Sequence, residues 1–129
     1  MGVEGDFGIG ELAQRTGRSA HAIRWYEAQG LIPNVTRDGG GRRRYTRWHM
    51  DWLSFLERLK TTGMPVREMK RYATLIARGG ESLAEQEALL RAHRDIVSAR
   101  MRSVEEALGL IDRKLVHYGR LREGRRQRP

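Results

Sequence analysis

The sequence contains no cysteine, only three prolines and no run of about 18 apolar residues. Without cysteine, the chain has no disulfide, no thiolate zinc site, no cysteine nucleophile and no thiol-based redox switch. Without a long apolar run we expect no membrane-spanning helix, and residues 1–9 lack the basic start and apolar centre of a signal peptide. We therefore expect a soluble, cytoplasmic protein.

Positive charge, by contrast, is plentiful: 25 Lys and Arg against 16 Asp and Glu give a net charge of +9. This excess favours a polyanionic partner, which is DNA, RNA or an anionic membrane. Residues 1–78 hold 14 basic and eight acidic side chains, residues 79–118 hold six and seven, and residues 119–129 hold five and one. Because the last segment has little apolar content to offset its ordering entropy, we predict a basic, disordered tail over residues 119–129.

Two short helices begin the chain. Ile9, Leu12 and Ala13 have the i, i+3, i+4 spacing of one helical face, and Gly17 suits the left-handed end of that helix. Ser19 is a good N-cap for a second helix that ends near Gln29. Two helices joined by about three residues that include a glycine predict a helix-turn-helix.

The second helix presents an unusual outer face. Ile23 and Tyr26 share the predicted inner face, whereas His21, Arg24 and Trp25 recur on the outer one. An exposed Trp is usually partly buried or committed to a partner. Two interpretations remain: Trp25 packs against the following segment, or this face enters a DNA major groove.

An arginine-rich hairpin follows. Short β-prone segments on either side of residues 38–42 predict two strands around a glycine-rich loop. The loop lacks the Gly-Lys-Ser/Thr ending of a phosphate-binding P-loop. Five arginines and a tyrosine within this stretch indicate a phosphate-binding surface, although a merely solvated basic hairpin is the alternative. These residues are Arg37, Arg42, Arg43, Arg44, Tyr45 and Arg47.

Two further helices supply a core. Thr46 suits the N-cap of a third helix, whose apolar side includes Trp52, Leu53 and Phe55. Pro65 begins a fourth helix, which carries an apolar stripe until Gly79. The Met and aromatic side chains of these helices are typical of a core rather than of a cofactor site.

From residue 82 to residue 118 the chain has the pattern of one long helix. Apolar residues recur every seven positions, with a second set four positions further on, and the repeat is strict from Val97. Such a stripe needs a partner, so we expect a homodimer, with folding back onto the chain's own head as the alternative. We call this stripe the seam; its expected interface residues are Leu90, Val97, Met101, Val104, Leu108, Ile111, Leu115 and Tyr118.

Four motifs in this order resemble the MerR family of bacterial transcription regulators. They are Ile9-Gly10-Glu11-Leu12-Ala13, residues 22–33 (AIRWYEAQGLIP), residues 41–46 (GRRRYT) and Thr62-Gly63-Met64-Pro65. The resemblance covers about residues 7–118. It implies a mainly α fold with a winged helix-turn-helix head over residues 7–79, an antiparallel coiled-coil dimerisation helix over residues 82–118, and the tail.

The resemblance also implies a function. Such regulators bind a pseudo-palindromic operator in an over-long promoter spacer, and they bend and untwist it so that RNA polymerase engages both promoter elements. We expect Arg24, Arg42, Arg43 and Arg44 mainly at phosphates, and His21 and Trp25 at base edges. The full set expected at DNA is Arg18, Ser19, His21, Arg24, Trp25, Tyr26, Arg37, Arg42, Arg43, Arg44, Tyr45 and Lys60.

Several departures from the family pattern matter. The Arg-Tyr-Tyr of the family's recognition helix is Arg24-Trp25-Tyr26 here, which removes one hydroxyl. The four histidines show no metal-ligand spacing, so we expect no metal site and no cofactor. The chain most resembles the branch that includes aldehyde and electrophile sensors, but Arg58 occupies the position of their sensor cysteine. Drug-sensing members append a ligand domain, and we expect none after the long helix.

Three classes of function fit these observations: a promoter-specific regulator, an architectural DNA-bending protein, and a coiled-coil interaction protein whose head binds RNA or an acidic protein. We favour the first. No paired carboxylates, nucleophile with a base or cofactor loop suggests an enzyme, and we expect no catalytic residues.

Overall fold

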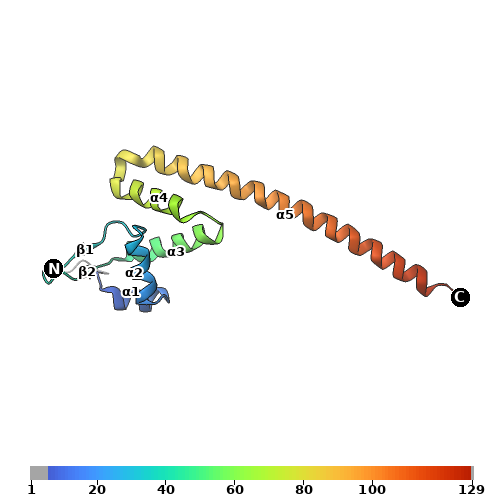
Figure 1. Cartoon of the computed structure of the whole chain (residues 1–129), viewed down its shortest axis with the longest axis horizontal. Coiled ribbons are helices and arrows are strands. Elements are labelled where there is room, and N and C mark those ends of the chain that lie inside the picture. The colour runs from blue at the N-terminus through green and yellow to red at the C-terminus, as the bar shows by residue number, and fades with distance from the viewer. Residues whose placement is uncertain (1–5, 129) are drawn as a thin grey trace. The chain divides into compact units, whose positions relative to one another are not determined.

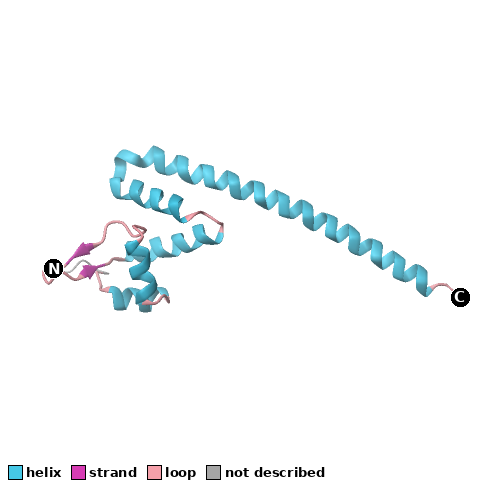
Figure 2. Cartoon of the chain, in the orientation of Figure 1, coloured by secondary structure: helices cyan, strands magenta, loops and turns pink. Residues whose placement is uncertain are grey.

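The computed structural model describes residues 6–128 and is mainly helical, as predicted (Figures 1 and 2). Its elements are α1 (Ile9–Thr16), α2 (Ala20–Ala28), β1 (Thr36–Arg37), β2 (Arg43–Arg44), α3 (Arg47–Thr61), α4 (Val66–Arg78), the 3-10 helix η1 (Gly79–Ser82) and α5 (Leu83–Arg126). The chain divides into two compact units, with the boundary between residues 90 and 91.

Helices α1 and α2 form the predicted helix-turn-helix. Gly17 ends α1 at φ 70°, a left-handed conformation that a β-carbon would disfavour. Ser19 caps α2, and its Oγ accepts the Ala22 backbone N–H at 3.0 Å. Leu12 and Ile23 are fully buried where the two helices meet the core. Because both ends of the turn are determined by local backbone chemistry, the turn sets the direction of α2.

The predicted hairpin is present, and we call residues 36–44 the wing. Its two strands are antiparallel, with Thr36 opposite Arg44 and Arg37 opposite Arg43. Asp38 organises the loop, since its Oδ1 accepts the backbone N–H groups of Gly40 at 2.9 Å and Arg42 at 3.0 Å. The Arg42 hydrogen bond is the main reason that the pKa of Asp38 lies below its ordinary value. The loop therefore holds a defined shape although it is exposed.

The core of the head lies under α3 and α4. The Trp52 indole donates to the Leu31 carbonyl oxygen at 2.7 Å, and its ring stacks on Tyr72 of α4. Leu89, near the beginning of α5, completes this core. Phe55 was predicted on the apolar side of α3, but its ring is partly exposed at the edge of Tyr72.

His49 of α3 has a role that the sequence did not predict. Thr46 is the N-cap as expected, and its backbone N–H donates to His49 Nδ1 at 3.0 Å. His49 Nε2 lies 3.0 Å from the Pro33 carbonyl oxygen, to which it donates. This arrangement requires neutral imidazole with its proton on Nε2. Burial keeps the pKa of His49 below its ordinary value, outweighing the Pro33 hydrogen bond and the Glu27 carboxylate, which both raise it.

This arrangement predicts an acid-dependent loss of stability. Below about pH 6.5 the unfolded chain protonates His49, whereas the folded chain does so only at lower pH. The free energy of unfolding should therefore decrease as the pH decreases, until the lowered pKa of the folded state is reached. Urea unfolding at fixed protein concentration between about pH 5 and pH 8 measures this. His49→Gln keeps an acceptor for the cap but does not titrate, so its pH dependence should be flatter. His117→Gln, which replaces an exposed imidazole of α5 outside this hydrogen-bond network, is the matched control.

The long helix differs from its predicted limits. It continues to Arg126, so the prediction of disorder from residue 119 is wrong as far as that residue. Leu, Arg and Glu are good helix formers, and no proline interrupts them before the end. Leu90, predicted in the seam, packs instead against the core of the head. Within residues 6–128, no helix is long and apolar enough to cross a membrane.

Candidate nucleic-acid interface

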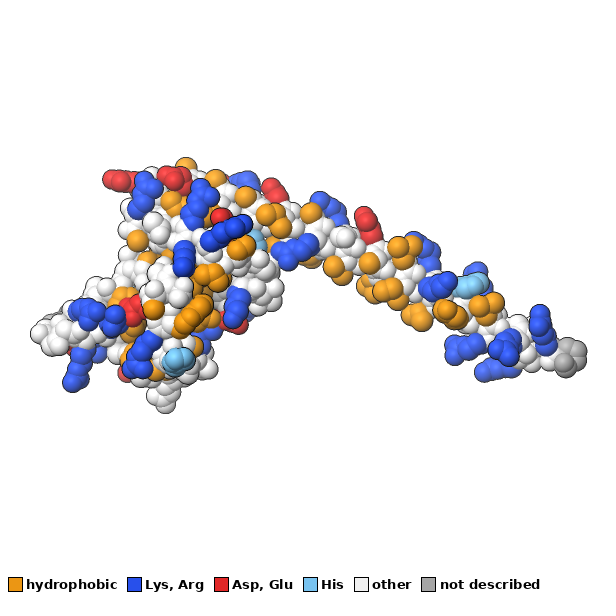
Figure 3. Space-filling view, viewed as in Figure 1, with side chains coloured by type: hydrophobic (Ala, Val, Ile, Leu, Met, Phe, Trp, Pro, Cys, Tyr) orange, Lys and Arg blue, Asp and Glu red, His pale blue; other side chains and the backbone are white. Residues whose placement is uncertain are grey.

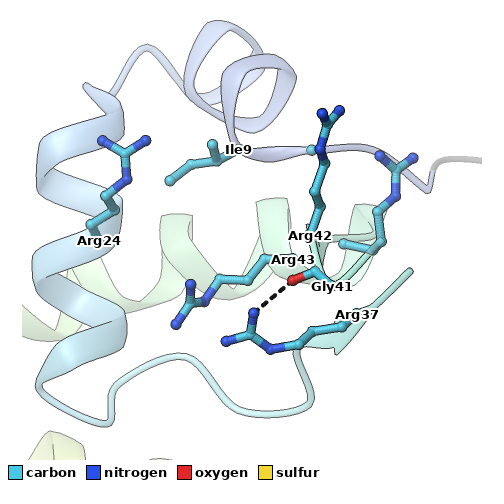
Figure 4. A pocket seen from close by; sticks show the side chains of 8 residues that line it. Ile9, Arg24, Arg37, Gly41, Arg42 and Arg43 are labelled. Carbon is cyan, nitrogen blue, oxygen red and sulfur yellow. Dashed lines mark hydrogen bonds between the residues drawn. The ribbon is translucent and has the colours of Figure 1, made fainter. Parts of the chain in front are cut away.

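Five arginines line an open pocket beside α2, which we call the basic pocket (Figure 4). It has a volume of about 380 Å³. Figure 4 shows Arg24 extending from α2 and Arg37, Arg42 and Arg43 extending from the wing. The lining residues are Gly8, Ile9, Arg24, Arg37, Gly41, Arg42, Arg43 and Arg44. Arginines that are separate in the sequence are thus gathered on one surface, with a density of positive charge suited to phosphate.

The arginines of the basic pocket differ in their own contacts. Arg37 Nη1 donates to the Gly41 carbonyl oxygen at 2.7 Å, within the wing. Arg44 pairs with Asp6, through Nε to Oδ1 at 3.2 Å and Nη2 to the carbonyl oxygen at 2.9 Å. Arg43 pairs with Glu27 of α2. Arg24 and Arg42 are exposed and make no hydrogen bond or ion pair through their guanidinium groups within the described chain, so they are the most available to an anion.

The outer face of α2 is open to solvent. Trp25 is 47% exposed, and its ring meets Tyr26 edge-on at a centroid distance of 5.5 Å. His21 and Arg24 are exposed beside it. Tyr26, predicted at DNA, is half-buried and packs against the core, where it orients Trp25. An indole held in this way offers an apolar surface and one N–H donor to a partner.

Tyr45 was predicted to contact DNA, and this prediction is wrong. The residue is fully buried, its backbone pairs with Phe7, and its hydroxyl donates to Glu27 Oε2 at 3.4 Å. Burial, with the nearby Glu27 charge, raises the pKa of Tyr45 to about 12, so the hydroxyl keeps its proton at neutral pH. Tyr45 supports the base of the wing. The sequence did not reveal the burial of Tyr45, because β2 is too short for a clear alternation of exposed and buried residues.

Two other predicted contacts lie apart from the basic pocket. Arg18 is directed toward α3, where it donates to Glu57 at 2.9 Å and to the Leu53 carbonyl oxygen at 3.3 Å. Its Nε is buried without a partner. Lys60 is exposed in the last turn of α3 and does not line the basic pocket. Ser19 remains at the N-terminus of α2 as its cap, a place where helix N–H groups favour an anion.

Helix α5 carries a second candidate interface. From Met101 to Leu121 its large apolar side chains are 49–66% exposed, and Figure 3 shows many of them in orange along the helix. The exposed set includes Met101, Val104, Leu108, Ile111, Leu115 and Tyr118 of the predicted seam. Ile96, Leu110, Val116 and Leu121 are exposed as well, but they lie outside the seven-residue register of the seam. Apolar area of this extent is typical of a protein interface.

No group of three or more His, Asp or Glu side chains within residues 6–128 is placed to hold a metal ion. The site presents arginine and exposed aromatic groups on a helix-turn-helix and a hairpin. This combination defines a winged helix-turn-helix protein.

The chain belongs to the MerR family. The sequence model of the MerR HTH family of regulatory proteins matches residues 7–75. An HTH-type transcriptional regulator of Haemophilus influenzae is 35% identical over 84% of this chain and 80% of its own length.

Solved structures agree with this assignment. HiNmlR, a MerR family regulator that lacks the sensor domain and was crystallised with promoter DNA, is 32% identical, with a TM-score of 0.73 over 92% of this chain and 94% of its own. A MerR family transcriptional regulator from Listeria monocytogenes is 29% identical, with a TM-score of 0.76 over 87% of this chain and 85% of its own. The protein is accordingly a MerR-family transcriptional regulator.

Proposed function

We propose that this protein binds double-stranded promoter DNA as a homodimer and regulates transcription from that promoter. The observation that carries the proposal is the basic pocket beside the exposed face of α2, where the guanidinium groups of Arg24 and Arg42 have no hydrogen-bond or ion-pair partner among residues 6–128. HiNmlR, which resembles this chain over almost its whole length, was crystallised with promoter DNA. The proposal places the protein in the cytoplasm, with RNA polymerase as a partner at the promoter.

The contacts divide by chemistry. Arginines of the wing and Arg24 bind phosphates, which sets the position of the head on the duplex. His21 and Trp25 lie on the face of α2 that enters the major groove, where they read base edges and the thymine methyl group. Because a single short helix reads few bases, a palindrome read by two heads is needed for a specific site.

The seam of α5 pairs with the same seam of a second copy. Its charge distribution favours an antiparallel pair: residues 83–106 hold five acidic and four basic side chains, whereas residues 107–126 hold two and six. A parallel pair would place the two basic ends side by side, where like charges repel. An antiparallel pair places each basic end beside the nearly neutral half of the other helix.

Sequencing the DNA fragments that the purified protein retains tests this function. We expect a pseudo-palindromic site within promoters, bound at least about 10³-fold more tightly than random duplex. Equal binding to all duplexes would identify an architectural DNA-bending protein instead. Preference for RNA or for an acidic protein over any duplex would support the third class.

The mechanism proposed on that site is distortion of the promoter. Two heads held at a set separation engage both half-sites only if the DNA changes its twist and curvature, and distorting a site of 20–30 bp costs about 1–6 kcal/mol. Contacts from two basic heads offset this cost. We therefore expect the promoter spacer to be longer than optimal and the bound operator to be bent and untwisted at its centre.

Removing two base pairs from that spacer should make transcription independent of the protein, because the shorter promoter already aligns its two elements. Permuted-fragment mobility on the unmodified operator should show a bend. Straight bound DNA, or a shortened promoter that still requires the protein, would favour simple occlusion or recruitment over distortion.

A further inference from the structure

An acidic residue stands within the surface proposed to bind DNA. Glu27 lies on α2, three residues after Arg24, and its Oε2 pairs with Nε of Arg43 in the wing at 2.5 Å. The same oxygen accepts the hydroxyl of buried Tyr45 in a long hydrogen bond of 3.4 Å. A carboxylate here repels phosphate, so its presence needs a compensating function.

The exposure of the pair indicates that function. The Glu27 side chain is only 16% exposed, whereas that of Arg43 is 46% exposed. The carboxylate binds the guanidinium through Nε, the nitrogen nearest the side-chain stem. The two terminal nitrogens of Arg43 make no hydrogen bond within the described residues and remain donors. Figure 4 shows the Arg43 side chain reaching from the wing toward α2, beside Arg37.

Holding Arg43 also joins two elements. Glu27 belongs to α2. Arg43 belongs to β2, and Tyr45 is the first residue after that strand. Among residues 6–128, the other contact between a wing guanidinium and a carboxylate is that of Arg44 with Asp6, which precedes α1. Glu27 is thus the side chain through which α2 contacts Arg43 of the wing. The angle between α2, proposed to read bases, and the wing, proposed to bind phosphate, depends on Glu27.

We propose that Glu27 is a positioning residue that presents Arg43 to the DNA phosphate backbone and couples the wing to the recognition helix. This inference rests on the proposed DNA-binding function. A guanidinium that is already oriented by a carboxylate loses less rotamer freedom when it binds phosphate. That gain outweighs the repulsion between Glu27 and the phosphate, because Glu27 is neutralised by the guanidinium that it holds.

The test is Glu27→Gln in the full-length protein, with affinity for the selected operator measured against salt concentration. Net charge alone predicts tighter binding, since one negative charge is removed. Positioning predicts the opposite: binding weakens about three- to tenfold, as expected for loosening one charge-assisted contact. The slope of log affinity against log salt should also become shallower by roughly one, because Arg43 no longer occupies its phosphate.

Glu11→Gln is the matched control. It removes the same charge from the same head, at an exposed carboxylate that pairs with Arg15 within α1. Its operator affinity should be unchanged or slightly higher, with the wild-type salt slope. Thermal unfolding of each variant separates a folding defect from a binding defect.

A double-mutant cycle with Arg43→Ala decides whether Glu27 acts through Arg43. In the Arg43→Ala background, Glu27→Gln should no longer weaken binding. An equal loss in both backgrounds would show a merely structural contribution and would overturn the proposal. Tighter binding by Glu27→Gln would overturn it too and would make Glu27 an inhibitory contact. If the wild-type protein binds no duplex, the proposed function itself fails, which is a different result from either of these.

Discussion

If the proposed dimer forms through the seam, replacing Val104 and Leu108 with Asp should convert it to a monomer. We then expect affinity for a two-half-site operator to fall by about 10²- to 10⁴-fold, the advantage that linked binding modules have over single ones. Both side chains lie in the seam and are more than half exposed in the single chain. In a pair of seams, four aspartates would be buried against apolar side chains, which costs far more than the lost contacts. Sedimentation and operator titration measure the two effects.

The matched control changes apolar residues of the same helix outside the seam. Leu110→Asp with Val116→Asp introduces the same two charges at side chains that are 61% and 55% exposed. Because neither residue lies in the seven-residue register of the seam, this variant should remain a dimer with nearly wild-type operator affinity. A dimer that survives the seam changes and dissociates with the control would place the interface on another face of α5.

Trp25→Ala should reduce the preference for operator over random duplex about 10- to 100-fold, the value of one lost base contact. The indole is half-exposed on the outer face of α2, so its removal leaves the core intact and should lower the melting temperature little. Because Trp25 carries no charge, the salt slope should not change. Titrations with operator and random DNA at several salt concentrations give both quantities.

Arg42→Ala provides the contrasting variant. Arg42 lines the basic pocket, and its guanidinium makes no hydrogen bond or ion pair with the part of the chain that the structure describes. Its loss should therefore weaken binding to all sequences alike and lower the salt slope by roughly one. A change in sequence preference at constant slope would show that the wing reads bases. A lower slope with Trp25→Ala would contradict the assignment of Trp25 to the bases.

The sequence predicted those features that depend on neighbouring residues. Gly17 ends α1 through its left-handed backbone, and Ser19 begins α2 as its N-cap. Both preferences act within one turn of helix. The hairpin and the seam of α5 follow from turn residues and from a seven-residue period, which are equally local. For the same reason the four family motifs, each a short segment, were sufficient to predict the class of protein.

Local sequence patterns did not predict the contacts of side chains that have several possible partners. A run of arginines predicts a basic surface, but not that Arg18 binds Glu57 or that Arg24 and Arg42 stay free. The predicted disorder after residue 118 assumed that a stretch poor in apolar residues has nothing to order it, yet α5 continues to Arg126.

The sequence by itself therefore determined the main helices, the hairpin and their order, because helix periodicity, capping and turn chemistry operate over a few residues. It also predicted the two surfaces that we propose as interfaces. Only the tertiary structure decided that Tyr45 is buried and that Glu27 joins α2 to Arg43. Those contacts link residues 16 or more positions apart. They arise when packed elements bring donors and acceptors into reach, and a buried polar group must find a partner among whatever the fold places beside it.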